Sequence, residues 1–107
     1  MITVTFCRTD AENSLTAEGH AGWAESGRDV VCAAVSALIF SLAQAVEKRR
    51  EPCDTEARSA AVLCEGEARI RCVRTAVTDA WFSLTVNGLS AIARQYPGFI
   101  QIRRNSL

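Results

Sequence analysis

Two residues of this chain have the side chains that nucleophilic catalysis on an amide would use, His20 and Cys32. A cysteine attacks as its thiolate, and a free thiol with a pKa of about 8.5 needs help to ionise at neutral pH. A neighbouring imidazolium stabilises the thiolate and can then protonate a leaving amine. If the fold brings the two together, they form a dyad suited to nucleophilic catalysis.

The same two residues also have a structural interpretation. Cysteine is among the most often buried residue types, and Cys32 stands in an apolar run that could be helix core. A single histidine at the end of a strand is more often a surface residue than a catalyst. Composition and spacing alone leave both interpretations open.

Cys32 must be positioned by a helix. Asp29 is a favourable N-cap, because its carboxylate can accept the free amide N–H groups of the first turn. We expect the helix to run from Asp29 to about Arg50 and to stop before Pro52. Cys32 then lies in the first turn, where amides and the helix dipole favour an anion. The Asp29 carboxylate would oppose this unless it faces away or pairs with His20.

His20 must be positioned by strands and a loop. Period-two alternation predicts one strand at the N-terminus and a second from Ser14 to Gly19, after a turn over residues 9–13. The residues expected to face the core are Ile2, Val4, Phe6, Leu15 and Ala17. The stretch from His20 to Arg28 has no clear period and contains glycines, so we interpret it as a mobile loop.

The second half of the chain is expected to contain two more strands, a second helix and a last strand. Ala60–Cys64 and Ala68–Val73 are expected to form two strands that turn at residues 65–67. A second helix follows, and its apolar stripe is expected at Val77, Trp81, Leu84, Gly88, Ile92 and Tyr96. Pro97 and Gly98 end it, and residues 99–102 form a last strand. The predicted fold is an α+β single two-layer domain over residues 1–107, ordered strand-strand-helix-strand-strand-helix-strand, with the helices on one face of a small sheet.

Charge and hydropathy exclude several function classes. The 107 residues carry 12 Lys and Arg against 12 Asp and Glu, so no net charge favours nucleic acid or an anionic membrane. The longest apolar run, Val30–Ala43, is shorter than the roughly 20 residues that span a bilayer. We therefore expect a buried helix, no membrane and no direct nucleic-acid contact.

The cysteines indicate reduced thiols. Cys7, Cys32, Cys53, Cys64 and Cys72 are odd in number and show no CxxC spacing, and His20 is the single histidine. These features argue against a disulfide framework and against a metal site, and we expect no cofactor. The N-terminus lacks the order of an export signal, so we expect a cytoplasmic protein. A redox-sensing thiol would need a resolving cysteine, and none is near Cys32 in sequence.

Residues 19–38, GHAGWAESGRDVVCAAVSAL, resemble the signature of the ribosomal-processing cysteine protease family Prp. That pattern pairs Gly-His-Ala with an aromatic residue and Ala-Glu, and places Gly-x-Asp and two hydrophobic residues before Cys-Ala. Chain length, element order and the closing segment 96–102 agree as well. The resemblance therefore covers essentially the whole chain.

The resemblance implies a small homodimeric cysteine protease with a His–Cys dyad. Cys32 would be the nucleophile, and His20 the base and then the acid. Asp29 would anchor the loop and the helix start, and Ser36 lies one turn beyond Cys32 on the same helix face. The residues implied to let the loop move are Gly19, Gly22 and Gly27.

Trp23 and Glu18 are further candidates. Trp23 stands where the family more often has Tyr or Phe, and either substrate contact or a core or dimer contact explains it equally well. Glu18, two positions before His20, could orient the imidazole, although an exposed strand charge is the commoner role for such a residue.

The family substrate implied by the resemblance is the N-terminal extension of a large-subunit ribosomal protein, the twenty-seventh of its set. The extended segment would carry aromatic residues before the cut. The alternative is a non-catalytic, ribosome-associated binding module in which His20 and Cys32 are structural.

Dimer formation also has a basis in the first helix, which is apolar around nearly its whole circumference. A two-layer domain would leave part of this surface uncovered. The residues expected in the uncovered patch are Val35, Leu38, Ile39, Leu42 and Val46.

Overall fold

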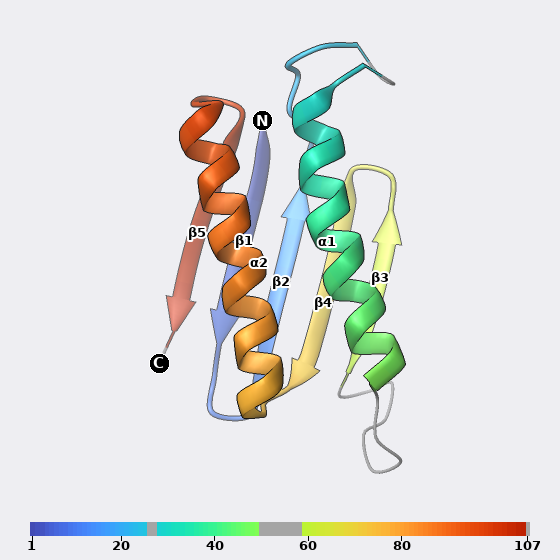
Figure 1. Cartoon of the computed structure of the whole chain (residues 1–107), viewed down its shortest axis with the longest axis vertical. Helices are drawn as coiled ribbons and strands as arrows, with labels where there is room; N and C mark the ends of the chain where they lie inside the picture. Colours follow the sequence, from blue (N-terminus) through green and yellow to red (C-terminus); the bar gives the residue numbers. More distant parts are fainter. Residues whose placement is uncertain (26–27, 50–58, 107) are drawn as a thin grey trace.

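The computed structural model describes residues 1–25, 28–49 and 59–106. Its elements are β1 (Ile2–Arg8), β2 (Glu12–Glu18), α1 (Val30–Arg49), β3 (Ala60–Cys64), β4 (Glu67–Val73), α2 (Ala76–Gln95) and β5 (Ile100–Ser106). The strands form one five-stranded sheet in the order β3-β4-β2-β1-β5, and both helices cover the same face (Figure 1). This confirms the predicted α+β fold and its element order.

Strand pairing corrects two predicted boundaries. β1 pairs antiparallel with β2 and parallel with β5, from Ile2 opposite Ile100 to Arg8 opposite Ser106. β5 is therefore longer than the predicted strand 99–102, because backbone pairing along β1 carries its polar residues too. The turn after β1 is shorter than predicted, since β2 already begins at Glu12.

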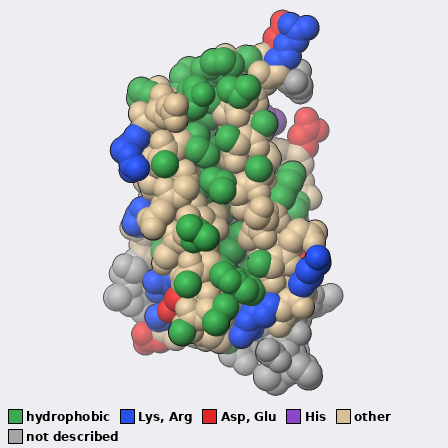
Figure 2. Space-filling view, viewed as in Figure 1, with side chains coloured by type: hydrophobic (Ala, Val, Ile, Leu, Met, Phe, Trp, Pro, Cys, Tyr) green, Lys and Arg blue, Asp and Glu red, His purple; other side chains and the backbone are tan. Residues whose placement is uncertain are grey.

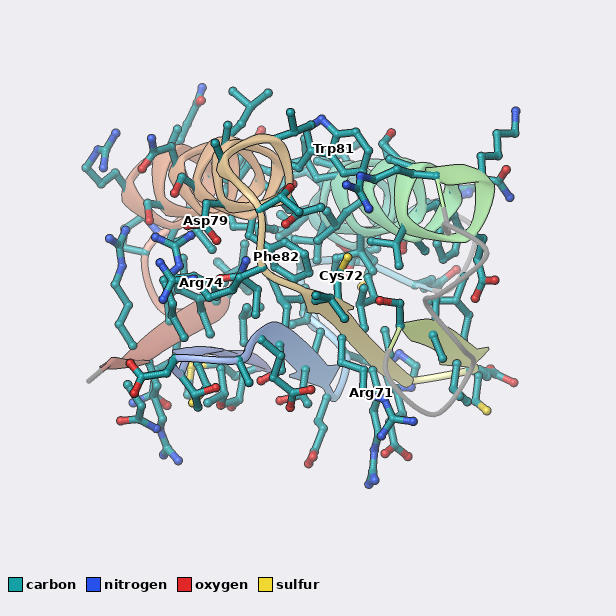
Figure 3. All side chains as sticks on the ribbon, turned by 90° about the horizontal axis from the view of Figure 1, so that it is seen from below. Arg71, Cys72, Arg74, Asp79, Trp81 and Phe82 are labelled. Atoms are coloured by element: carbon teal, nitrogen blue, oxygen red, sulfur yellow. The ribbon has the colours of Figure 1, made fainter. Side chains whose placement is uncertain are left out.

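The strand alternation is confirmed. Successive side chains point to opposite faces of a strand, and the inward set is buried beneath the helices. In Figure 3, Cys72 points from β4 towards the helices, while Arg71 points away from them. The buried apolar residues of the strands are Ile2, Val4, Phe6, Leu15, Ala17, Ala68, Ile70, Cys72 and Ile100.

The prediction of an uncovered apolar patch on α1 is wrong at the residues named for it. Val35, Ile39 and Leu42 are each 3% exposed, because the sheet and α2 cover this face of the helix. Val46 is also buried, and Leu38 packs against the core. The exposed large apolar residues of α1 are instead Val30 and Phe40.

The packing of α1 inside the domain distinguishes it from a membrane-spanning helix. The whole helix Val30–Arg49 is longer than the apolar run, and by length and composition alone it could cross a membrane. In this fold it packs against α2 and against β3 and β4. It is a core helix of the domain.

The predicted stripe of α2 is confirmed in part: Trp81, Ile92 and Tyr96 pack against the core as partly buried residues, but the buried face of the helix is formed by other residues. Its buried residues are Thr78, Phe82, Thr85, Val86 and Leu89. The threonines can be buried because Thr78 Oγ1 donates to the carbonyl of Val73 and Thr85 Oγ1 donates to that of Trp81, each at 2.9 Å.

Two residues of the predicted stripe consequently lie on the surface. Val77 is 52% and Leu84 73% exposed. Figure 2 shows hydrophobic side chains gathered over this outer surface of the helices. Gly88 does face α1, where a Cβ atom would stand 3.0 Å from Cδ1 of Leu38.

A polar cluster joins the strands to the start of α2. Asn13, fully buried, donates from Nδ2 to Asp79 at 2.7 Å and accepts from Nε of Arg8 at 2.6 Å. Arg74 contacts Asp79 at 2.9 Å, and these two side chains lie side by side in Figure 3. The hydrogen bond from Arg74 is the main cause that lowers the pKa of Asp79 to about 2. This cluster fixes the end of the sheet remote from the start of α1 (Figure 1).

Candidate active site

Three chain segments meet at one end of the sheet. β2 ends at Glu18, α1 begins at Val30, and the β3–β4 turn lies beside both (Figure 1). The amide of Gly19 donates to the carbonyl of Gly66 in that turn at 2.9 Å. The segment leading into His20 is therefore held against the hairpin.

Cys32 lies in the first turn of α1, where the sequence predicts it. The side chain of Asp29 accepts the Cys32 amide N–H at Oδ1, at 3.0 Å. Its Oδ2 accepts the amides of Trp23 at 3.1 Å and Ala24 at 3.4 Å. The Cys32 amide is the largest cause that lowers the pKa of Asp29; desolvation opposes it, and the two loop amides add to it.

The thiol of Cys32 receives an amide from the loop. Ala21, which is buried, donates its backbone N–H to Sγ at 3.3 Å. The Cys32 amide is already bound to Asp29, so the Ala21 amide is the one that points at the reacting atom.

His20 shares the site but is not bonded to the thiol. Its side chain is exposed, and in the described part of the chain it makes no hydrogen bond to Cys32. Its ring lies against the β3–β4 turn instead: a Cβ atom on Gly66 would be 3.1 Å from Nε2.

Two cavities meet at these residues. The first, of about 300 Å³, has an apolar wall between α1 and β4 that includes Val35, Phe40 and Ala68. The second, of about 520 Å³, lies on the loop side and is lined by Gly22 and Asp29. The residues common to both cavities are His20, Cys32, Ser36 and Glu65. The thiol therefore has open space on two sides, as cleavage within a peptide requires.

The structure unites most of the site residues predicted from sequence. Ser36 lines both cavities, Gly19 the first and Gly22 the second. Gly19 and Gly22 have positive φ angles of 97° and 73°. Gly27 lies outside the described residues.

Trp23 and Glu18 are placed apart from the thiol. The Trp23 ring meets Tyr96, the C-cap residue of α2, edge-on with centroids 6.0 Å apart, and it lines neither of the two cavities. Glu18 is exposed at the end of β2, and in the described chain it makes no hydrogen bond to His20.

The remaining described cysteines differ in burial. Cys72 is buried and Cys7 half-buried, whereas Cys64 is exposed at the end of edge strand β3. Cys53 lies outside the described residues. Among the described His, Cys, Asp and Glu residues, no group could hold a metal ion.

The sequence reasoning missed the β3–β4 turn as part of the site. The sequence predicts only a turn at Glu65 and Gly66, yet Glu65 lines both cavities and a Cβ atom on Gly66 would meet the imidazole. The available signal was a glycine between two glutamates, which indicates a turn but not what the turn contacts.

A cysteine at a helix N-terminus that shares a peptide-sized cleft with a histidine is the arrangement of a cysteine protease. The sequence profile described as cysteine protease Prp matches residues 1–101. The chain is also 34% identical over 96 residues to the ribosomal processing cysteine protease Prp of Mycoplasma genitalium, covering 90% of this chain and 92% of that relative. The chain therefore belongs to the Prp family of ribosomal processing cysteine proteases.

Two solved structures share the fold of this chain. The essential ribosomal processing protease Prp from S. aureus, with a covalently linked product peptide, matches with a TM-score of 0.82 at 24% identity, over 98% of this chain and all of that one. Its structure with a substrate peptide matches with a TM-score of 0.72 at 25% identity, over 100% of both chains. At 24% identity, the match to the structure with the product peptide supports the fold alone.

Proposed function

We propose that this protease removes the N-terminal extension of a large-subunit ribosomal protein, the twenty-seventh of its set, in the cytoplasm. Cys32 is the nucleophile in this proposal, and His20 is the base and then the acid. One observation carries it: Sγ of Cys32 lies at the start of α1, under the Ala21 amide, in cavities that it shares with the chain's single histidine.

The reaction follows from these groups. His20 accepts the thiol proton, and the thiolate of Cys32 attacks the scissile carbonyl carbon. The imidazolium returns the proton to the leaving amine as the C–N bond breaks, which leaves a thioester on Sγ. His20 then accepts a proton from water, the hydroxide cleaves the thioester, and the thiol is restored.

We infer the direction in which the peptide binds from the two cavities. We assign the residues before the cut to the apolar cavity, whose wall includes Val35, Ile39 and Phe40. Aromatic side chains would bury their rings there. The residues after the cut would lie along the loop, past Gly22 and Asp29.

The test is cleavage of a synthetic peptide that spans the extension junction of the same organism's ribosomal protein, followed by mass spectrometry. Wild type should cut at one bond, whereas Cys32→Ala and His20→Ala should reduce kcat/KM by at least about a thousandfold. Cys32→Ser should also be nearly inactive, because a hydroxyl does not ionise at this site. The control is Cys7→Ala, which removes a half-buried thiol that lines neither cavity and should leave the rate unchanged.

Near-full activity of Cys32→Ala would end this mechanism. Tight binding of the peptide without cleavage by wild type would favour the non-catalytic binding module. The rate of thiol alkylation distinguishes the protease from the binding module. Because Cys64 is more exposed than Cys32, faster labelling of Cys32 would report an activated thiol rather than accessibility.

A further inference from the structure

The β3–β4 turn contains two residues. Cys64 pairs with Glu67, so Glu65 and Gly66 form the turn itself. Gly66 has a φ of 73°, a conformation that disfavours any residue with a Cβ atom. The turn carbonyl of Gly66 accepts the Gly19 amide, and this ties the hairpin to the residue immediately before His20.

The second constraint on Gly66 is the imidazole itself. A Cβ atom built on Gly66 would stand 3.1 Å from Nε2, 3.5 Å from Cε1 and 3.9 Å from Cδ2 of His20. The ring edge that carries Nε2 therefore lies over the α-carbon of Gly66. Gly22 and Gly98 also have positive φ, yet a Cβ on either would have no neighbour within 4 Å.

This contact matters because little else holds the ring. His20 is exposed, and in the described chain it makes no hydrogen bond. The same imidazole must nevertheless remain at the mouth of both cavities, beside Cys32. The bare turn is the surface on which it rests.

We propose that Gly66 is a positioning residue for His20: because the turn lacks a side chain there, the imidazole can lie against it and face the Cys32 thiol. This inference rests on the proposed dyad. A Cβ atom at position 66 would stand 3.1 Å from Nε2, closer than an ordinary van der Waals contact, so the ring must move away from the turn by a few tenths of an ångström, and its position relative to Sγ changes.

The test is a double-mutant cycle read out by the alkylation rate of Cys32 with iodoacetamide, followed on the Cys32 peptide by mass spectrometry. This rate reports the thiolate and stays measurable without the histidine. At pH 7, Gly66→Ala should slow alkylation about fivefold, whereas in a His20→Ala background it should change the rate less than about 1.5-fold. In a plot of the alkylation rate against pH, Gly66→Ala should shift the acid limb in the wild-type background but not in the His20→Ala background.

Two further variants separate the ring contact from backbone strain. Gly98→Ala introduces the same kind of strain with no ring nearby, so it should lower Tm but leave the alkylation rate unchanged. Gly66→Asn keeps the Cβ atom, but asparagine tolerates positive φ. It should slow alkylation as alanine does with a smaller loss of Tm, and it decides the matter if Gly66→Ala does not fold.

An equal effect of Gly66→Ala in both backgrounds, or a wild-type rate in both Gly66 variants, would overturn the role of Gly66 and leave the dyad standing. If His20→Ala itself leaves Cys32 alkylation unchanged, the dyad and the inference both fail. A protein that does not cut the ribosomal peptide but shows the expected cycle would refute the substrate and leave the role of Gly66 standing.

Discussion

The carboxylate of Asp29 accepts the backbone N–H of Cys32 at 3.0 Å and, with its other oxygen, the amides of Trp23 and Ala24. One side chain thus starts the helix that carries the thiol and fastens the loop that follows His20. Because this loop also supplies the Ala21 amide to Sγ, the loop and the helix start act as one unit around the thiol.

Asp29→Asn should separate these two tasks. Asparagine can still accept the Cys32 amide through Oδ1, so the helix cap and Tm should be nearly unchanged. Its NH₂ group cannot accept the Trp23 and Ala24 amides, so the loop should loosen and kcat/KM should fall about tenfold. Asp29→Ala should lose both activity and Tm. Wild-type peptide cleavage by Asp29→Asn would show that the loop contacts do not support the reaction.

Substitution of Gly22 should test loop movement. The thiol and imidazole must come within hydrogen-bond reach, yet a peptide must enter between them, so we expect the loop to close over bound peptide. Gly22→Ala restricts a residue whose φ is 73° but creates no steric contact. We expect kcat to fall several-fold in steady-state cleavage, with Gly98→Ala as the control for strain elsewhere. The partner glycine of the loop, Gly27, should behave in the same way.

The exposed apolar surface of the helices predicts a homodimer. Leu84 and Val77 on α2 and Val30 on α1 expose large apolar side chains, and Figure 2 shows such side chains across this face. Leu84→Glu should therefore give a monomer in light scattering at micromolar concentration, where wild type gives a dimer. Leu63→Glu, an exposed leucine on edge strand β3, is the matched control and should remain dimeric. A wild-type monomer mass would contradict the prediction.

The Asp79 cluster predicts acid-dependent stability. The pKa of Asp79 is lowered to about 2, chiefly by its hydrogen bond from Arg74. Because the pKa of this carboxyl group is lower in the folded state than in the unfolded state, its ionised form stabilises the fold. The stabilisation is complete above about pH 4 and is lost as the pH falls towards 2. Its size is on the order of 1–2 kcal/mol after allowance for solvent.

Melting curves from pH 5 to pH 2 test this. Asp79→Asn should have a lower Tm than wild type at pH 5, and the difference should shrink as the pH falls. Asp29, whose pKa is also lowered, contributes in the same direction, so some acid dependence should remain in the variant. A constant difference across the range would assign the loss to packing rather than to charge.

Local patterns in the sequence were sufficient for much of this protein. Alternation identified the inward residues of β1 and β2, because a strand exposes two faces whatever its neighbours are. The aspartate before an apolar run located the start of α1, and thus a capped Cys32, because capping involves residues only a few positions apart. The motif around His20 and Cys32 indicated the family.

The buried faces of the helices needed the tertiary structure. α2 buries Thr78 and Thr85 while Leu84 is exposed, because the threonine hydroxyls find backbone acceptors and the position of the sheet decides which side is covered. The same reason places Val35 and Ile39 inside the domain rather than on its surface. Apolar periodicity does not state which neighbour will cover a given face.

The surroundings of the imidazole were likewise decided by the tertiary structure. His20 and Gly66 are far apart in sequence, and they meet because β4 pairs with β2 and so brings the β3–β4 turn to the end of the strand that precedes His20. A glycine in a turn signals only its own backbone conformation. Which side chain fills the space above it depends on strand pairing between distant segments, and that is a property of the whole sheet.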